Sequence, residues 1–288
     1  MSDTKLVYIT FGFFDRVYRL LLCSEEDVAS VNIRDSLMES VKWEDDGKFL
    51  YHDDLAMMTI PDLHIFAENV DLRAKESGVD ASEIIFLSRH RAATEIPTLT
   101  VHPIGNFNIA DFGGKNRTLV QTSPSLMTGL LRSMASKDTR HFRVSFEVTH
   151  HGPFVNIPAT FIEIGSEITQ WSNKHAAKLL ADSILETKGE DNEKVIGIGG
   201  GHYAPRFTEI ATRFKVDFGH MIPEYAFSHS NEEEVARMIA DAAKESGTKL
   251  VYVHRKSMNG DKRKLVMKAI SACGLEVIRS SDMEIIGN

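Results

Sequence analysis

The sequence has little cysteine and no long apolar run. Its two cysteines, Cys23 and Cys273, lie far apart and outside any CxxC spacing, which excludes a zinc site built from thiolates and suits a reducing compartment. The apolar runs fall well short of the ~20 residues that a membrane-spanning helix needs. The segment Met1–Lys5 is polar, unlike a signal peptide. We therefore expect a cytoplasmic protein outside the membrane, in which any metal is held by histidine and carboxylate.

An excess of positive charge is also missing. The 33 lysine and arginine residues against 41 aspartate and glutamate residues give a net charge of −8, which excludes a protein that coats nucleic acid by neutralising its phosphates. Two local basic patches remain, Arg132–Arg143 and Arg255–Lys268. Each can equally be a solvated helix end or loop.

Several catalytic motifs are absent as well. The chain has no GxSxG elbow, no HExxH helix, no GxxxxGK[ST] loop and no HxE with PCxxC. Serine hydrolases, helical zinc proteases, NTPases and nucleobase deaminases are thereby disfavoured. A dinucleotide fingerprint begins at Gly197 and Gly199, but His202 stands where its third glycine belongs.

What the chain contains is typical of a globular α/β protein. With 288 residues, 42% of them hydrophobic and 26% charged, it can bury a large core. Apolar runs alternate with helical patterns, of which Glu167–Glu186 is the longest, and a first strand is expected at Leu6–Phe11. These patterns predict a mostly parallel twisted sheet with helices on both faces, made mixed by a hairpin around Pro153. We expect one compact catalytic unit, 1–288, with closely packed lobes 1–165 and 166–288 as its possible division.

The stretch Phe142–Ser166 organises the rest of the chain. Its first part alternates apolar and polar residues, the period of a half-buried strand, and then stops at His150, His151 and Gly152. The chain returns with Glu163 inside an apolar run, where a carboxylate is costly to bury unless it is paired. A lone strand-end histidine is more often a hydrogen-bonded loop residue than a ligand, so His150 alone would carry no conclusion.

Other expected strands also end in histidine. These are Glu83–Arg91 with His90, Thr98–His102, the strand before Gly199–His202, the segment Val216–Phe227 with His220, and Lys249–Val253 followed by His254. In open α/β sheets ligands bind beyond the carboxyl ends of the strands, so a convergent site is expected there. Such a set of histidines and carboxylates suits zinc with an open position for water.

Two glycine-rich loops accompany these strands. Gly199, Gly200 and Gly201 precede a helix and offer N–H groups to an anion or oxyanion. The loop Gly105–Asn116 can bring its backbone close to an anion or a ribose, or it can be an ordinary long loop.

Together these motifs resemble the archaeal-type D-aminoacyl-tRNA deacylase family. The resemblance is carried, in colinear order, by SRH at Ser88–His90, LTVHPIGN at Leu99–Asn106, THHGP at Thr149–Pro153, FIEIGS at Phe161–Ser166, GGGHYAPRFT at Gly199–Thr208 and GHMIPEYA at Gly219–Ala226. It implies a zinc-dependent hydrolase that cuts the ester between a D-amino acid and the 3′ end of tRNA, a proofreading step of translation.

The resemblance also implies roles for the residues. Zinc is expected on His90, His150, His202 and His220. Catalysis is assigned to His151, Glu163 and Glu147, and whether each glutamate is a ligand, an orienting group or the general base stays open. Substrate contacts are expected from Asn106, Gly113, Gly114, Lys115, Gly199, Gly200 and Gly201, with the N–H groups of Gly200 and Gly201 receiving the oxyanion. The protein is expected to be a monomer that holds tRNA through Lys115, Arg117, Arg132, Lys137 and Arg140, or else through Arg255–Lys268.

Two other functions compete with this interpretation. One is a metal-independent α/β enzyme of the nucleoside phosphorylase or peptidase kind, which metal analysis would separate from a zinc hydrolase. The other is a tRNA-binding or zinc-storage protein, against which a buried Glu163 argues because a metal store has no use for an additional base.

Overall fold

The computed structural model describes residues 16–92, 95–228 and 230–287. The first strand expected at Leu6–Phe11 lies outside these residues. The strands are β1 Val17–Ser24, β2 Glu44–Asp45, β3 Leu50–His52, β4 Leu55–Ile60, β5 Asp80–Arg91, β6 Thr98–Pro103, β7 Gly105–Asn106, β8 Thr118–Leu119, β9 Arg143–Phe146, β10 Ala159–Ser166, β11 Glu193–Ile198, β12 Val216–Ile222, β13 Leu250–Val253 and β14 Glu276–Ile278. The helices are α1 Val28–Ser40, α2 Val70–Glu76, α3 Pro124–Ala135, α4 Ile168–Trp171, α5 Lys174–Glu186, α6 Pro205–Arg213, α7 Glu232–Glu245 and α8 Gly260–Ala272.

An eight-stranded sheet with the order β2-β3-β4-β1-β5-β10-β6-β9 forms one side of the molecule. Strands β4, β1, β5 and β10 run parallel, whereas β6 runs antiparallel to β10 and β9 follows β6. The predicted mixed, mostly parallel sheet is confirmed. The hairpin expected around Pro153 is wrong, because β6 lies between β9 and β10. All of β10 is buried, which suits a central strand, while β9 exposes Arg143 at the edge.

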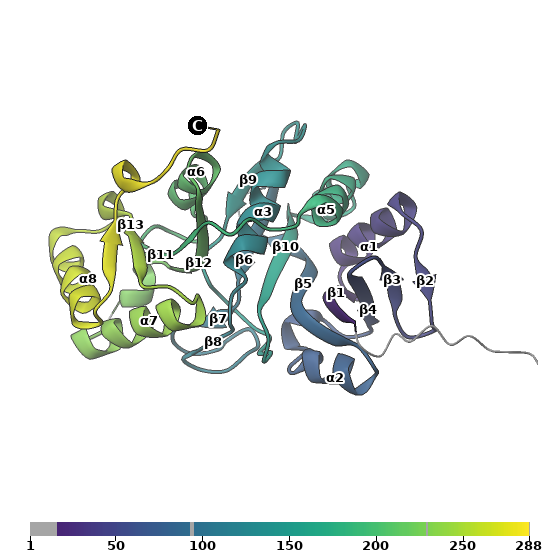
Figure 1. Ribbon diagram of the computed structural model, residues 1–288, viewed down its shortest axis with the longest axis horizontal. Coiled ribbons are helices and arrows are strands. Elements are labelled where there is room, and N and C mark those ends of the chain that lie inside the picture. The colour runs from purple at the N-terminus through teal and green to yellow at the C-terminus, as the bar shows by residue number, and fades with distance from the viewer. Residues whose placement is uncertain (1–15, 93–94, 229, 288) are drawn as a thin grey trace, which may run out of the picture.

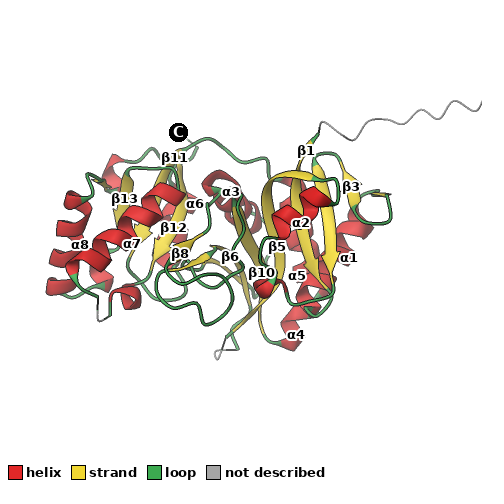
Figure 2. Cartoon of the chain, turned by 90° about the horizontal axis from the view of Figure 1, so that it is seen from below, coloured by secondary structure: helices red, strands yellow, loops and turns green. Residues whose placement is uncertain are grey.

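A second sheet stands beside the first, as Figure 2 shows. It has four parallel strands in the order β12-β11-β13-β14. Helices α7 and α8 cover one face, and α6 packs on the other through Phe207 and Ile210. Strands β7 and β8 form a small separate ladder.

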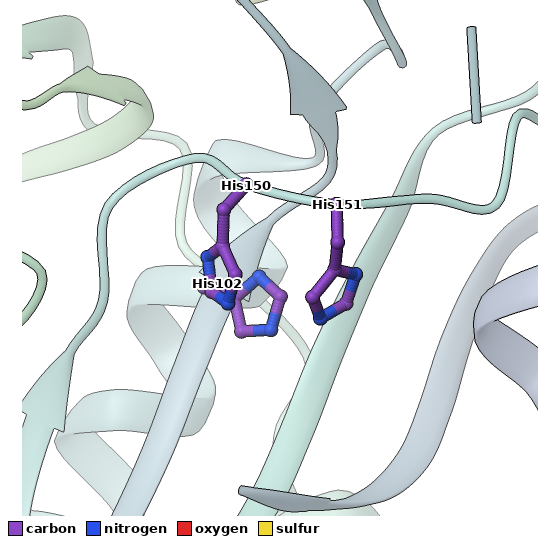
Figure 3. Close-up of side chains that lie close together, drawn as sticks. All are labelled: His102, His150 and His151. Carbon is purple, nitrogen blue, oxygen red and sulfur yellow. The ribbon is translucent and has the colours of Figure 1, made fainter. Parts of the chain in front are cut away.

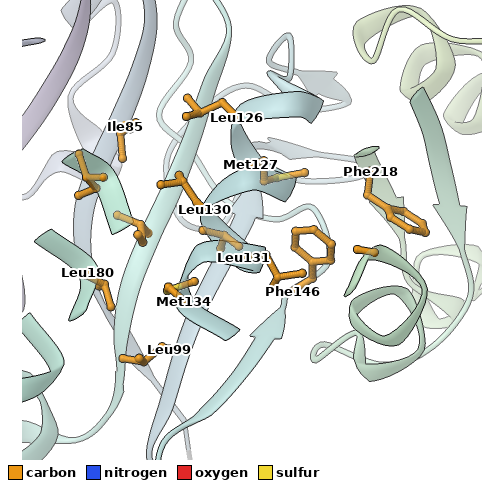
Figure 4. Packing of buried hydrophobic residues seen from close by; sticks show 14 of the residues in the cluster. Ile85, Leu99, Leu126, Met127, Leu130, Leu131, Met134, Phe146, Leu180 and Phe218 are labelled. Atoms are coloured by element: carbon orange, nitrogen blue, oxygen red, sulfur yellow. The ribbon is translucent and has the colours of Figure 1, made fainter. Parts of the chain in front are cut away.

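Helices cover both faces of the eight-stranded sheet, as expected. Leu21 and Cys23 of β1 pack with α1, α3 and α5, while the alternating Leu20 and Leu22 pack on the side of α2. The first of these clusters continues into the four-stranded sheet, where the ring of Phe146 lies beside that of Phe218 (Figure 4). The two sheets thus share one continuous apolar core.

The helix expected at Glu167–Glu186 is divided in the structure into α4 and α5. The Asn173 side chain accepts a hydrogen bond from the Ala176 N–H and caps a new helix start. Among the helices of the described residues, none combines the length and the apolar composition that a membrane crossing requires.

Three neighbouring strands bring polar side chains to the α2 face of the large sheet. In register, Gly165 of β10 lies opposite His90 of β5, and Phe161 of β10 lies opposite His102 of β6. Glu163 falls between these pairs. Because β6 runs antiparallel to β10 and β5, the carboxyl ends of β5 and β6 lie at opposite ends of the strands of the sheet. The site expected beyond the carboxyl ends therefore lies over the face of the sheet.

Candidate functional site

Histidines and glutamates from distant parts of the chain lie together on the α2 face of the eight-stranded sheet. We call them the histidine–glutamate cluster: His90 on β5, His102 on β6, Glu163 on β10, Glu147, His150 and His151 after β9, and His202 after β11. The cluster unites the expected catalytic residues with every expected zinc ligand except His220.

Glu147 lies between three histidines of the cluster, His90, His150 and His202. Its side chain is completely buried. Its Oε1 lies 3.2 Å from His90 Nδ1, and its Oε2 lies 3.1 Å from His202 Nε2 and 3.6 Å from His150 Nε2. A buried carboxylate is stable only when its charge is paired, and here histidines surround it.

Glu163 lies near His90 and His102. Its Oε2 lies 3.5 Å from His90 Nδ1 and accepts a hydrogen bond of 3.5 Å from the Thr100 hydroxyl, while its Oε1 lies 3.7 Å from His102 Nε2. Although only 3% of the side chain is exposed, Glu163 lines a cavity that Glu147 does not reach. The two carboxylates thus occupy different depths.

Three imidazole rings are turned toward one another in Figure 3: His102, His150 and His151. Their ring centroids are 4.1 Å (His102–His150), 4.4 Å (His150–His151) and 4.9 Å (His102–His151) apart. Each Nδ1–H donates to a backbone carbonyl: His102 to Pro103 at 3.1 Å, His150 to Val148 at 2.7 Å and His151 to Gly152 at 2.6 Å. These bonds fix the tautomer and leave each Nε2 with its lone pair, as in metal-binding histidines.

The charges of the cluster favour a cation. Burial disfavours the charged form of His90, but the neighbouring carboxylates of Glu147 and Glu163 outweigh it and raise the pKa of His90 to about 11. Against the same burial cost, His202 and His90 hold the pKa of Glu147 well below its usual range. Burial, followed by the charge of a neighbouring histidine, lowers the pKa of His151 to about 4. The two carboxylates and the neutral imidazoles of His150 and His151, whose pKa values burial lowers, form a donor set that matches a divalent metal.

The residues present fit a zinc ion. Three groups place one ligand atom per residue within 4.8 Å of one another: His90 with Glu147 and His202, His102 with His150 and His151, and His102 with Glu147 and Glu163. Buried atoms without a hydrogen-bond partner occur in the same places, namely Nε2 of His90, Nε2 of His102 and both carboxylate oxygens of Glu147. Polar atoms so buried normally have a partner, and a metal would supply it.

A cavity of about 500 Å³, the cluster cavity, opens onto this set. Its far wall includes two exposed aromatic rings, Phe66 and Phe112, which are 57% and 66% exposed. Asp27 and His64 also line it, with His64 Nε2 3.8 Å from Asp27 Oδ2. The cavity therefore combines a polar floor with an aromatic rim.

His220 does not join the cluster. It is completely buried; its Nε2–H donates to the Val120 carbonyl at 2.9 Å and its Nδ1 lies 3.0 Å from the Thr149 hydroxyl. Both ring nitrogens are thus occupied by structural hydrogen bonds. The expected role of His220 as a zinc ligand does not fit this geometry.

The loop around Gly113 supports the site from outside. Asn106 donates to the Gly113 carbonyl at 3.0 Å, and the Gly114 N–H donates to Glu68 at 2.7 Å. The Lys115 ammonium lies 3.4 Å from the centroid of the Phe154 ring. These residues hold the loop against the His151–Gly152 turn, so the structure gives them a clear supporting role. Direct contact with substrate stays a prediction.

The other glycine loop, Gly199–Gly201, lines a neighbouring cavity. The Gly200 N–H donates to the Ser257 hydroxyl at 2.8 Å. Since that donor is already engaged, the oxyanion role expected for Gly200 does not fit, and for Gly201 it stays a prediction.

Residues of the basic patch expected to hold tRNA have partners within the protein. Arg132 is part-buried and donates to the carbonyls of Ala211 and Phe214, both at 2.8 Å, and it pairs with Asp217 at 3.4 Å. The other members are also engaged: Lys137 pairs with Glu186, Arg117 with Glu234, and Arg140 with Asp138. Arg132 therefore has a structural role, while tRNA binding by Lys115, Arg117, Lys137 and Arg140 stays a prediction.

Sequence reasoning missed part of the site. His102 was noted at a strand end but given no role, although its position matches that of His90. The Asp27–His64 pair had no detectable signal, because the two residues meet only through the packing of α1 and the turn His64–Phe66 against the sheet.

Comparisons with known proteins agree on one family. The sequence model of the family described as D-aminoacyl-tRNA deacylase matches residues 77–278. A protein of that name from Methanosarcina mazei is 34% identical over 284 residues, covering 91% of this chain and 92% of its own. One from Thermoplasma acidophilum is 34% identical, covering 90% and 98%. A crystal structure of a conserved protein of unknown function superposes with a TM-score of 0.85 at 33% identity, covering 94% of this chain and 99% of that one.

Proposed function

This chain belongs to the D-aminoacyl-tRNA deacylase family, and we propose that it removes D-amino acids from tRNA with the help of a zinc ion held in the histidine–glutamate cluster. It is a hydrolase of aminoacyl-tRNA ester bonds. The family match leaves the nucleoside phosphorylase, peptidase and non-enzymatic alternatives without support. The zinc ion and the roles of the residues are our proposal, as is work in the cytoplasm, where translation takes place.

His90, Glu147 and His202 are the proposed zinc-holding residues. Their ligand atoms lie within 4.8 Å of one another, and His90 Nε2 and the Glu147 carboxylate are buried without hydrogen-bond partners. His202 is the most open of the three, with 39% of its side chain exposed, so the site faces the cavity from this side. Zinc bound there would lower the pKa of water to about 7 and polarise the ester carbonyl.

Glu163 is the proposed general base. It lines the cluster cavity, while Glu147 lies beneath and does not. The base must reach the proton of the attacking water, and only Glu163 of the two carboxylates has access to the cavity. Its Oε2 also accepts from Thr100 and lies 3.5 Å from His90 Nδ1, so its carboxylate is held in one orientation.

His151 is proposed to position the substrate. Its Nδ1–H is fixed on the Gly152 carbonyl at 2.6 Å, which leaves the Nε2 lone pair to accept a hydrogen bond in the cavity. A substrate whose amino group or ribose hydroxyl donates to such an acceptor, and whose other end rests on the aromatic rim of Phe66 and Phe112, cannot rotate away from the attacking water. Positioning of this kind accounts for a large share of many enzymatic accelerations.

The observation that carries this proposal is the burial of unpartnered histidine and glutamate atoms under a cavity of about 500 Å³. The test is to incubate the protein with matched D- and L-aminoacyl-tRNA, with and without a chelator. We expect release of the D-amino acid alone, loss of that activity on chelation, and its return with zinc. Full deacylation by metal-free protein would refute the zinc assignment, and equal release of both enantiomers would refute the assigned specificity.

A further inference from the structure

A basic cavity lies at the carboxyl ends of β13 and β14 in the four-stranded sheet. It has a volume of about 450 Å³, and its cationic lining consists of Arg206, His254, Arg255, Lys256 and Arg279. Carboxyl ends of parallel strands are the usual place for ligands in an α/β sheet. We call this space the basic cavity.

Three cations of the basic cavity have no ion-pair partner among the described residues, whereas Arg206 pairs with Glu209 at 2.6 Å. Among the described residues that line it, none is an aspartate or glutamate. No ion pair of the described residues includes Arg255, Lys256 or Arg279, although neighbouring Lys262 and Lys268 pair with glutamates. Burial, followed by the charges of Arg206 and Lys256, lowers the pKa of His254. A concave surface with like charges on its walls attracts an anion.

A second cavity borders the basic cavity on the side of the histidine–glutamate cluster. It has a volume of about 380 Å³, shares Arg206 and His254 with the basic cavity, and is also lined by Gly199–Gly201, Tyr203 and Tyr225. The one acidic residue among the described residues that line it, Glu224, pairs with Lys262. The Tyr203 ring lies 5.4 Å from that of His90. Tyr225 is 50% exposed and offers a ring face to a ligand. The second cavity therefore brings an exposed aromatic ring together with Arg206, a cation of the basic cavity.

We propose that these two cavities form the path of the single-stranded 3′ end of tRNA, with phosphates held by Arg255, Lys256 and Arg279 and a base stacked on Tyr225. The inference rests on the proposed function, which places the terminal aminoacyl ester in the cluster. Proteins that hold single strands combine a cationic groove with aromatic rings on which bases stack. Only a few phosphates have to be contacted, so the path is compatible with a net charge of −8.

Substrates of increasing length test the path. D-aminoacyl-adenosine carries the ester without a phosphodiester, a D-aminoacyl-CCA trinucleotide adds the single-stranded end, and D-aminoacyl-tRNA adds the folded body. The variant is Arg255→Glu with Arg279→Glu. The matched control is Arg263→Glu with Lys264→Glu, which makes the same charge change at exposed positions outside both cavities.

We expect the double variant to raise KM by about tenfold for the trinucleotide and for tRNA, with an unchanged kcat and an unchanged KM for aminoacyl-adenosine. The control variant should leave all three substrates unaffected. Tyr225→Leu should raise the same two KM values. A raised KM for tRNA with an unchanged KM for the trinucleotide would overturn the proposal, because the basic cavity would then contact the body of tRNA. An equal effect on aminoacyl-adenosine would also overturn it.

Binding of a CCA oligonucleotide that carries no amino acid can be measured independently of turnover. The slope of log Kd against log salt should fall by about 1 for each phosphate that the double variant no longer neutralises. A slope equal to that of the wild type would overturn the path even if the deacylase activity is intact. Absence of turnover on every substrate, with binding still sensitive to the variant, would instead refute the proposed function and leave the path standing.

Discussion

Nδ1 of His90 on β5 lies 3.2 Å from Oε1 of Glu147, which follows β9 at the far edge of the large sheet. Strands β10 and β6 separate β5 from β9, so the contact requires Glu147 to leave the edge of the sheet and reach back over its face. The proposed zinc-holding group, His90, Glu147 and His202, therefore connects the edge of the sheet to its middle, and its geometry depends on the charge of the buried Glu147 carboxylate.

Glu147→Gln keeps the shape of the side chain and removes its charge. We expect zinc affinity to fall by roughly 10- to 100-fold, because Glu147 is both a proposed ligand and the partner of His90 and His202. Zinc content after dialysis against a metal buffer measures this. Glu83→Gln, at a carboxylate paired with Arg19 away from the cluster, should retain full zinc content.

Glu163→Gln should separate chemistry from metal binding. As the proposed general base, Glu163 contributes about 10²–10⁴-fold to turnover, so kcat should fall by that factor while zinc stays bound. Single-turnover rates with saturating D-aminoacyl-tRNA and a parallel zinc assay give both quantities. Loss of zinc together with the rate would make Glu163 a ligand and contradict the assignment.

Gly152→Ala should disrupt the turn that carries His151. A Cβ at this position would lie 2.2 Å from the Gly114 nitrogen and 2.3 Å from the Gly113 carbonyl carbon, so the two loops must separate. We expect a loss of roughly 1–3 kcal/mol in the free energy of unfolding and a marked loss of activity. Gly260→Ala, where no heavy atom lies within 4 Å, should match the wild type in both measurements.

His220 should make the fold sensitive to acid. Burial lowers its pKa from 6.5 to about 3, so the unfolded chain takes up this proton at a higher pH than the folded one. The stability linked to neutral His220 is complete above pH 6.5 and is lost as the pH falls toward 3. At pH 5 the loss is about 2 kcal/mol.

His220→Gln removes this acid dependence. Urea unfolding between pH 7 and pH 5 should show a shallower decline for this variant than for the wild type, although the variant is less stable at pH 7 because two buried hydrogen bonds change. His175→Gln makes the same substitution at a partly exposed position and should keep the slope of the wild type. An identical slope in His220→Gln would mean that His220 does not titrate in this range.

Arg132 should behave as a structural residue. Arg132→Met leaves carbonyls of α6 and β12 and the buried Asp217 without their partner, which should cost about 3–5 kcal/mol of stability. The KM for tRNA, measured below the melting temperature, should not change. Arg140→Met, at an exposed arginine, should alter the free energy of unfolding by no more than about 0.5 kcal/mol. A raised KM for tRNA in Arg132→Met would contradict this structural role.

Local pattern was sufficient for much of the fold. Strands β5, β6 and β10 follow the apolar runs that predict them, and the change of strand direction within the sheet was expected. The hairpin around Pro153 was wrong because adjacency along the chain does not determine adjacency in a sheet. Strand β10 is buried on both faces, so it lies between β5 and β6 rather than beside β9 at the edge.

Local sequence also could not distinguish His220 from the histidines of the cluster. His202 and His220 both follow apolar residues next to glycine, and nothing in their local sequence distinguishes them. The difference arises from which neighbour each ring meets: His202 reaches Glu147 across the two sheets, whereas His220 is enclosed by Val120 and Thr149. Sequence spacing identifies candidate ligands, and only the packing of the sheets selects among them.

The proposed zinc-holding group draws on residues that stand far apart along the chain, from His90 to His202. Contacts of such large sequence separation form late, because the entropy of closing long loops must be overcome first. A chain emerging from the ribosome therefore has no hydrolytic centre until the residues after β11 have been synthesised and both sheets have docked. Recovery of deacylase activity during refolding should accordingly lag behind recovery of helical signal, which makes the enzyme's own turnover a reporter of completed folding.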